Sequence, residues 1–201
     1  MNRKRIFKAG FLLLVFSLVS VFFVSLVQDS TKEQIKYNEE QLLIKRLGEL
    51  VQGYDNNILQ DKILKEVSLY GIKQTLSIYP AKKNNHTFAY LIEHTYPNGY
   101  SGNIRLLTGI GSDKKLLGVR VITHKETPGL GDKIETKKSN WIKQFKGLSL
   151  SGTNKKQWRV KRDGGIFDAF TGATVTPRAI VNATYQVLEL FNTKDFKDAT
   201  Q

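Results

Sequence analysis

The chain has 201 residues and a formal net charge of +13, and it contains no cysteine. Without cysteine it cannot form disulfides, bind an iron–sulfur cluster through thiolates or use thiol chemistry. A redox role would therefore need an organic cofactor. The length suits one domain of ordinary size with a short additional segment.

The N-terminal segment is first basic and then apolar. Residues 1–8 contain four Lys or Arg residues, and residues 9–27 carry no charge. Such an apolar run is long enough to cross a bilayer as a helix. A cleaved signal peptide is the alternative, but its usual small-residue cleavage site is missing. We predict a cytoplasmic basic flank at 1–8, a transmembrane anchor at 9–27 and, by the positive-inside rule, an exported domain at 28–201.

An excess of Lys and Arg remains in the predicted domain, in pairs such as Lys114-Lys115 and Lys155-Lys156. Pairs of this kind are typical of solvated loops and sheet edges. We expect an exported, membrane-tethered domain to have no nucleic-acid partner. The charge then contributes to solubility or attracts acidic lipid headgroups.

The sequence after the anchor predicts an α+β fold, with antiparallel strands flanked by helices. Apolar residues at helical spacing predict a first helix at 35–51. An antiparallel meander is predicted from four strands, at 73–79, 87–94, 103–109 and 116–123. Three elements follow: a helix at 134–145, a short strand at 158–161 and a long final helix ending at Phe191.

The segment 168–178, Asp-Ala-Phe-Thr-Gly-Ala-Thr-Val-Thr-Pro-Arg, leads into the final helix. Thr176 suits an N-cap and Pro177 the first helical position. Gly172 can adopt backbone angles closed to other residues and allows a ligand to approach closely. Because the first turn of a helix attracts anions, this segment predicts a phosphate site. The alternative is an ordinary helix start after a polar turn.

A second motif lies between the meander and the helix predicted at 134–145. Residues 124–133 read His-Lys-Glu-Thr-Pro-Gly-Leu-Gly-Asp-Lys, with two glycines and a Pro-Gly pair. On turn statistics alone, a Pro-Gly turn without a ligand is the alternative to a binding loop.

The two motifs together resemble the FMN-binding domain family that contains the G subunit of the Rnf (Rsx) electron-transport complex. The C subunit of the sodium-pumping NADH:quinone reductase shares this domain. The resemblance covers essentially the whole chain, including the anchor, the Gly-Tyr-Ser-Gly turn at 99–102 and the Asp-Gly-Gly segment at 163–165. It implies a membrane-anchored electron carrier with covalent FMN, located in the bacterial inner membrane with its domain in the periplasm.

The resemblance also implies a modification site. In the family, FMN is joined by its phosphate to a threonine, and a separate flavin transferase makes this bond from FAD with Mg²⁺. Mapped here, the modified residue is Thr174. The first hydroxyl position is Thr171, where serine is frequent in the family. The resemblance implies the following further flavin-binding residues: Asp168, Thr171, Gly172, Ala173, Thr176, Glu126, Thr127, Pro128, Gly129 and Leu130. We expect Asp168 to assist attachment or to orient the turn.

The implied function is that of a carrier subunit of a cation-translocating complex rather than a self-sufficient enzyme. Its partners would be the other subunits, the flavin transferase and the membrane. The alternatives are the C subunit of the sodium-pumping reductase, a tethered binding domain without flavin, and an exported hydrolase with a threonine nucleophile. The three histidines lack metal-ligand spacing, and no metal site is predicted. The two tryptophans, Trp141 and Trp158, are expected in the core.

Overall fold

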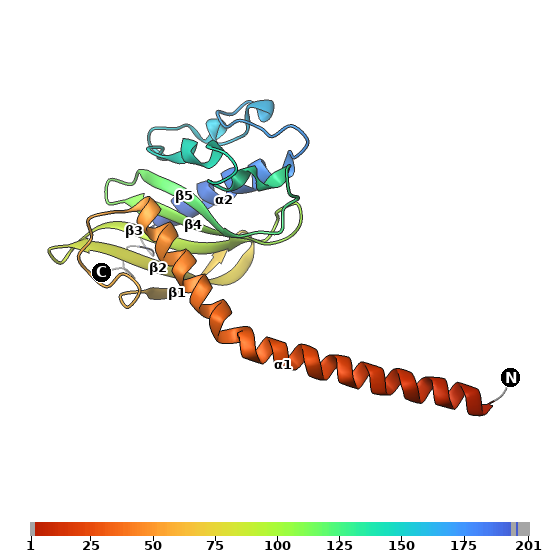
Figure 1. Ribbon diagram of the computed structural model, residues 1–201. Helices are drawn as coiled ribbons and strands as arrows, with labels where there is room; N and C mark the ends of the chain where they lie inside the picture. Colours follow the sequence, from red (N-terminus) through yellow and green to blue (C-terminus); the bar gives the residue numbers. More distant parts are fainter. Residues whose placement is uncertain (1–2, 194–195, 197–201) are drawn as a thin grey trace. The chain divides into compact units, whose positions relative to one another are not determined.

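The computed structural model describes residues 3–193 and 196 (Figure 1). The outermost residues of the predicted flank and domain, 1–2, 194–195 and 197–201, lie outside this part. The chain divides into two compact units, residues 1–44 and residues 45–201.

The helix α1 spans Arg3–Leu50. Most of it forms the first unit, and its last residues, from Lys45 on, belong to the second unit. Within the described residues, this is the one helix long and apolar enough to cross a membrane. The helix predicted at 35–51 is present up to Leu50, but as the last part of α1 rather than as a separate element, because α1 runs on without a break. No helix-breaking Gly or Pro stands between the apolar stretch and Leu47, so nothing in the sequence interrupts the backbone hydrogen bonds.

The second unit is built on a five-stranded antiparallel sheet in the order β1-β2-β3-β4-β5, which is the predicted meander with one further strand. The strands are β1 (Ile63–Leu69), β2 (Ile72–Lys83), β3 (His86–Tyr96), β4 (Ile104–Gly111) and β5 (Leu116–Thr123). The strand β1 was not predicted from the sequence. Its outward positions include exposed Leu64, so its apolar residues do not alternate cleanly with polar ones.

One face of the sheet carries the main core. Ile78, Ile92, Thr108 and Val119 are consecutive cross-strand neighbours on this face. The helix α2, Val175–Phe191, lies against this face with its apolar side, which includes Ile180, Ala183 and Val187 (Figure 1). Burying these side chains is the main driving force for the fold.

A buried polar chain joins the same face to α2. The side chain of His94 is 2% exposed and lies 2.9 Å from the Thr108 hydroxyl and 2.8 Å from the Tyr70 hydroxyl. Tyr70 donates to the carbonyl of Ala183, 3.0 Å away, so its oxygen accepts from Nδ1–H of His94. Burial lowers the pKa of His94 to about 3, and the imidazole is therefore neutral.

The opposite face is covered by the end of α1 and the residues that follow it. Gly109 and Gly118 are cross-strand neighbours on this face, and both lie against the side chain of Leu50. A Cβ at Gly118 would lie 3.0 Å from Leu50 Cδ2. Beside them, Glu49 accepts from Arg120 at 2.6 Å and from Arg46 at 3.1 Å. Two glycines thus make the room in which the last turn of α1 packs.

Residues 124–170 contain only short 3₁₀ helices, at Gly131–Ile134, Trp141–Phe145, Lys155–Gln157 and Lys161–Asp163. The predicted helix at 134–145 was wrong. Ser139 interrupts it, because its hydroxyl donates to the carbonyl of Lys133 and accepts from the N–H of Trp141. The predicted strand at 158–161 is reduced to a single bridge between Val160 and Phe167.

Candidate functional site

The motifs at 124–133 and 168–178 meet at the first turn of α2. They form a cavity of about 260 Å³, together with Tyr100 from the loop after β3. Its lining residues are Tyr100, Thr127, Leu130, Gly131, Gly172, Ala173, Thr174, Val175 and Thr176. Residues from three segments distant in sequence, namely Tyr100, 127–131 and 172–176, therefore make one pocket, which we call the Thr174 pocket.

The three threonines of the 168–178 motif have different environments. Thr176 is 1% exposed and its hydroxyl donates to Oε2 of Glu126. Thr171 is exposed in the turn and does not line the pocket. Thr174 is half-buried and lines the pocket, and its hydroxyl makes no hydrogen bond with the described residues. Thr174 thus combines an available hydroxyl with a position inside the cavity.

The predicted start of α2 was wrong by two residues. The helix begins at Val175, and Thr174 rather than Thr176 occupies the N-cap position. Thr176 is instead the second residue of the helix, and its hydroxyl donates to Glu126. The N–H groups at the start of a helix have no partner within the helix, so those of Val175 and Thr176 add positive potential beside Thr174.

Glu126 holds the three walls of the pocket together. The residue is 4% exposed, and its carboxylate accepts from the Thr176 hydroxyl on one oxygen and from the N–H of Ser101, at 3.0 Å, on the other. Gly99 and Gly131 pack against Glu126 so closely that neither position has room for a side chain. A Cβ at Gly131 would lie 2.9 Å from Glu126 Cβ, and one at Gly99 would lie 2.9 Å from Glu126 Oε1. Glu126 itself stands behind the pocket and does not line it.

His124 fixes the backbone of this loop. Its Nδ1 accepts from the N–H of Glu126 at 3.0 Å, and its Nε2 lies 3.1 Å from the carboxylate of Glu135. Because a backbone N–H can only donate, Nδ1 carries no proton and Nε2–H donates to Glu135. The imidazole thereby positions the residue that binds Thr176.

The remaining residues of the 126–131 loop form its exposed tip. The carbonyl of Thr127 accepts from the N–H of Gly131 at 2.9 Å, closing a turn in which Pro128 and Gly129 are exposed and outside the pocket. The backbone N–H of Gly129 keeps the pKa of Asp132 below its ordinary value. Leu130 is 42% exposed and lies across the pocket from Gly172, where a Cβ would be 3.2 Å from Leu130 Cδ2.

Asp168 lies away from the pocket. Its carboxylate is exposed and pairs with Lys161 at 2.6 Å, while its carbonyl accepts from the indole N–H of Trp141 at 2.8 Å. Asp168 thus fixes the start of the turn at both its backbone and its side chain. Sequence reasoning missed Tyr100 and Val175, which are 68% and 40% exposed at the pocket. The Gly-Tyr-Ser-Gly turn was the available signal for Tyr100.

The chain is similar in sequence to known protein families. Residues 99–189 match the model of the FMN-binding domain, and residues 1–50 match that of the RnfG N-terminal region. The G subunit of the ion-translocating oxidoreductase complex of Shewanella baltica (strain OS223) is 43% identical over 92% of this chain and 89% of its own length. The chain belongs to the family of these G subunits.

Other members of the G-subunit family are similarly related. The G subunit from Vibrio cholerae (strain M66-2) is 41% identical over 92% of this chain and 90% of its own length. The one from Pseudoalteromonas atlantica (strain T6c) is 44% identical over 88% of this chain and 83% of its own length. The FMN-binding match includes all three walls of the Thr174 pocket. The expected family is confirmed, and the C subunit of the sodium-pumping reductase is not favoured.

Proposed function

We propose that the chain is the FMN-carrying electron-transfer subunit of an ion-translocating oxidoreductase complex, with the flavin joined through its phosphate to Thr174. The family and its FMN-binding domain support the FMN-carrying role. The observation that carries the attachment site is the Thr174 hydroxyl, which lies in the pocket at the N-terminus of α2 without a hydrogen-bond partner among the described residues.

The surroundings of Thr174 suit a phosphoester. A phosphodiester keeps one negative charge, which the first turn of α2 stabilises. Gly172 has a φ of +82°, a conformation that side chains rarely adopt, and its missing Cβ leaves space between the turn and Leu130. Thr176 is a poor candidate for modification, because it is buried and its hydroxyl already donates to Glu126.

The size of the pocket suits only part of an FMN molecule. Pockets that enclose a drug-sized ligand measure about 300–1,000 Å³, and this one measures about 260 Å³. We therefore propose that Tyr100, Leu130 and Val175, which are exposed at its rim, flank an isoalloxazine ring that stays partly open to a redox partner. FMN supplies the electron chemistry, and the protein orients it.

The motif residues have distinct proposed roles. Thr127 lines the pocket and can reach the polar edge of the ring, whereas both carboxylate oxygens of Glu126 are already used in holding the walls. Pro128 and Gly129 shape the loop tip, and Ala173 lines the pocket beside Thr174. Asp168 orients the turn through Lys161 and Trp141 or assists the flavin transferase.

Four basic residues before the apolar stretch favour a cytoplasmic N-terminus. We propose that α1 anchors the chain in the inner membrane and that the folded unit lies in the periplasm. There the transferase would move the FMN phosphoryl group of FAD to the Thr174 hydroxyl, breaking the pyrophosphate bond and releasing AMP.

The full chain expressed with a flavin transferase tests this function. Its gel band should fluoresce as a flavin after denaturation, and the peptide containing Thr174 should carry the mass of FMN. Fluorescence should be lost in Thr174→Ala and kept in Thr171→Ala, which serves as the matched control. Absence of flavin from the wild-type band, with a known flavinylated protein labelled in parallel, would contradict the proposal.

A further inference from the structure

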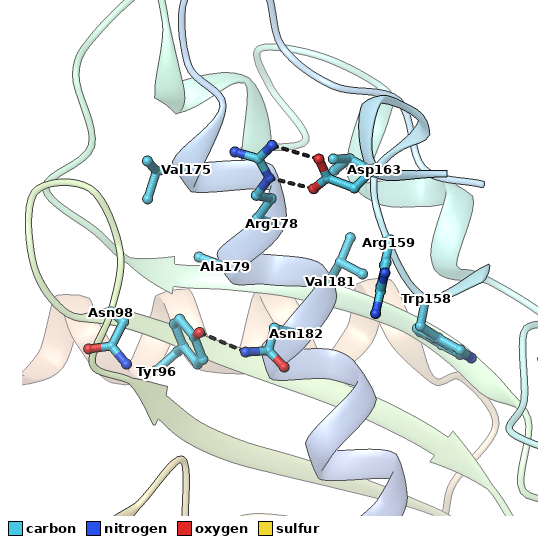
Figure 2. Close-up of a pocket in the computed structure, with 11 residues that line it drawn as sticks. Tyr96, Asn98, Trp158, Arg159, Asp163, Val175, Arg178, Ala179, Val181 and Asn182 are labelled. Atoms are coloured by element: carbon cyan, nitrogen blue, oxygen red, sulfur yellow. Dashed lines mark hydrogen bonds and ion pairs between the residues drawn. The ribbon is translucent and has the colours of Figure 1, made fainter. Parts of the chain in front are cut away.

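A second cavity, of about 500 Å³, shares Val175 with the Thr174 pocket. Figure 2 shows the residues that line this second cavity. Its walls are the N-terminal half of α2, the end of β3 at Tyr96 and the segment 158–163. A cavity of about 350 Å³ continues along α2 and shares Trp158, Arg159 and Asn182 with it. We call the two together the α2 groove; it extends from Val175 to Glu189.

One wall of the α2 groove is strongly basic. Residues 155–162 contain five Lys or Arg residues and no acidic residue. Of these, Lys156, Arg159 and Arg162 make no ion pair with the described residues, and all three are exposed. Arg159 lines both cavities. Arg159 thus brings an unpaired cation to both cavities, while Lys156 and Arg162 add positive charge from the same segment without lining either cavity.

The acidic groups of the groove do not neutralise these cations. The Asp163 carboxylate accepts two hydrogen bonds from Arg178, at 2.6 and 2.7 Å (Figure 2). This guanidinium is the main cause that holds the pKa of Asp163 below its ordinary value, and the charges of Arg162 and Arg159 lower it further, so one carboxylate faces three guanidinium groups. Glu189 accepts from the Tyr185 hydroxyl at 2.6 Å and lies 3.8 Å from Lys155. The acids of the groove are thus already paired, and the surplus charge is positive.

The groove also offers apolar surface. Tyr96, Trp158 and Val181 are each less than a tenth exposed but contribute to its wall. The indole N–H of Trp158 is buried and has no hydrogen-bond acceptor among the described residues. A ligand that matches this lining would combine apolar side chains with carboxylates.

The shape of the groove favours a polypeptide segment over a membrane surface. Val175 and Glu189 are separated by about 21 Å along a helix that rises about 1.5 Å per residue. An extended chain at about 3.3 Å per residue would cover this distance with six or seven residues. A flat bilayer surface would not enter a concave groove, whereas an extended segment can follow it.

We propose that the α2 groove binds an extended acidic segment of another subunit of the complex. Because Val175 lines both the groove and the Thr174 pocket, the bound segment ends beside the pocket. Electrostatic complementarity of this kind increases the rate and the specificity of association. The segment thereby holds its subunit next to the site of electron transfer. The redox consequence rests on the proposed flavin at Thr174, while the binding itself does not.

Charge reversal in the assembled complex tests the groove. The other subunits are recovered with the tagged full chain from solubilised membranes, at low and at high salt. The Arg159→Glu/Arg162→Glu variant should lower this recovery by at least about tenfold at low salt, a change of about 1.4 kcal/mol. The matched control is Lys73→Glu/Lys83→Glu, which makes the same charge change at exposed positions on β2 outside the groove. Its recovery should equal that of the wild type.

A photo-crosslinking residue in place of Gln186, which lines the second cavity, identifies the occupant. Crosslinks to a segment rich in Asp and Glu from a subunit of the complex would support the proposal. Crosslinks to lipid, or equal recovery of the two charge-reversal variants, would overturn it. Near-UV circular dichroism shows that each variant is folded. In-gel flavin fluorescence reports separately on Thr174, so a failure of flavin attachment would not be mistaken for a failure of the groove.

Discussion

The hydrogen bond between Thr176 and Glu126 joins α2 to the 126–131 loop, and its removal should weaken the whole domain. Thr176→Val keeps the shape of the side chain and deletes the hydroxyl. One carboxylate oxygen of Glu126, a residue that is 4% exposed, would then lose its donor. Hydrogen bonds to charged groups are worth about 1.5–3 kcal/mol. We therefore expect the free energy of unfolding to fall by about 2–3 kcal/mol.

Thr184 provides a matched control in the same helix. It is also fully buried, but its hydroxyl donates to the carbonyl of Ile180, 2.8 Å away and one turn earlier in α2. That carbonyl is a neutral acceptor, so Thr184→Val should cost only about 0.5–1 kcal/mol. Urea denaturation of the full chain in detergent, followed by near-UV circular dichroism, measures both changes.

The double variant Thr176→Val/Glu126→Gln tests whether the two residues act as a pair. If they do, its loss of stability should be smaller than the sum of the single losses by about 1–2 kcal/mol. The reasoning would be refuted by additive losses, or by a Thr176→Val loss no larger than that of Thr184→Val.

Two further predictions concern burial and backbone space. His94 stays neutral in the fold down to a pH of about 3, whereas the unfolded chain takes up the proton near 6.5. The unfolded state therefore binds more protons in this window, and stability should fall with decreasing pH by up to about 1.4 kcal/mol per pH unit. Urea denaturation across this pH range measures the free energy of unfolding, which should depend less steeply on pH in His94→Gln than in the wild type. An equal slope in the two proteins would exclude His94 as the cause of the pH dependence. A Cβ at Gly165 would lie 1.9 Å from the Arg159 carbonyl oxygen, whereas one at Gly164, where φ is +82°, would meet no atom within 4 Å. Gly164→Ala should lower the free energy of unfolding by about 1 kcal/mol, and Gly165→Ala should lower it clearly more. Thermal unfolding measures both losses, and equal losses would contradict this account.

The regular elements could be predicted from the sequence where their pattern was strong. The strands around Ile92 and Val119 combine β-branched residues with clear turns, and α2 has a complete apolar face. The apolar periodicity did not predict the structure correctly where hydrogen bonds from individual side chains fix the backbone. Ser139 divides the predicted helix at 134–145 through two hydrogen bonds that no periodicity reveals.

The residues of the candidate site could be predicted in part from the two sequence motifs. Motif resemblance selected Thr174, Thr127 and Leu130, which the structure brings together in one pocket. The role of Glu126 could not be predicted, because its partners Ser101 and Thr176 lie 25 and 50 residues away in the sequence. Only the folded chain shows that its carboxylate joins the walls rather than lining the cavity.

The packing of Leu50 against Gly109 and Gly118 determines where a soluble fragment of this protein should begin. A fragment that starts after the helix would lack Leu47 and Leu50, and it would leave a slot above the two glycines into which water could enter. It would also leave Arg120 without Glu49. The natural cutting point is therefore before Lys45, inside a continuous helix, and the last turn of that helix serves as the first packing element of the domain.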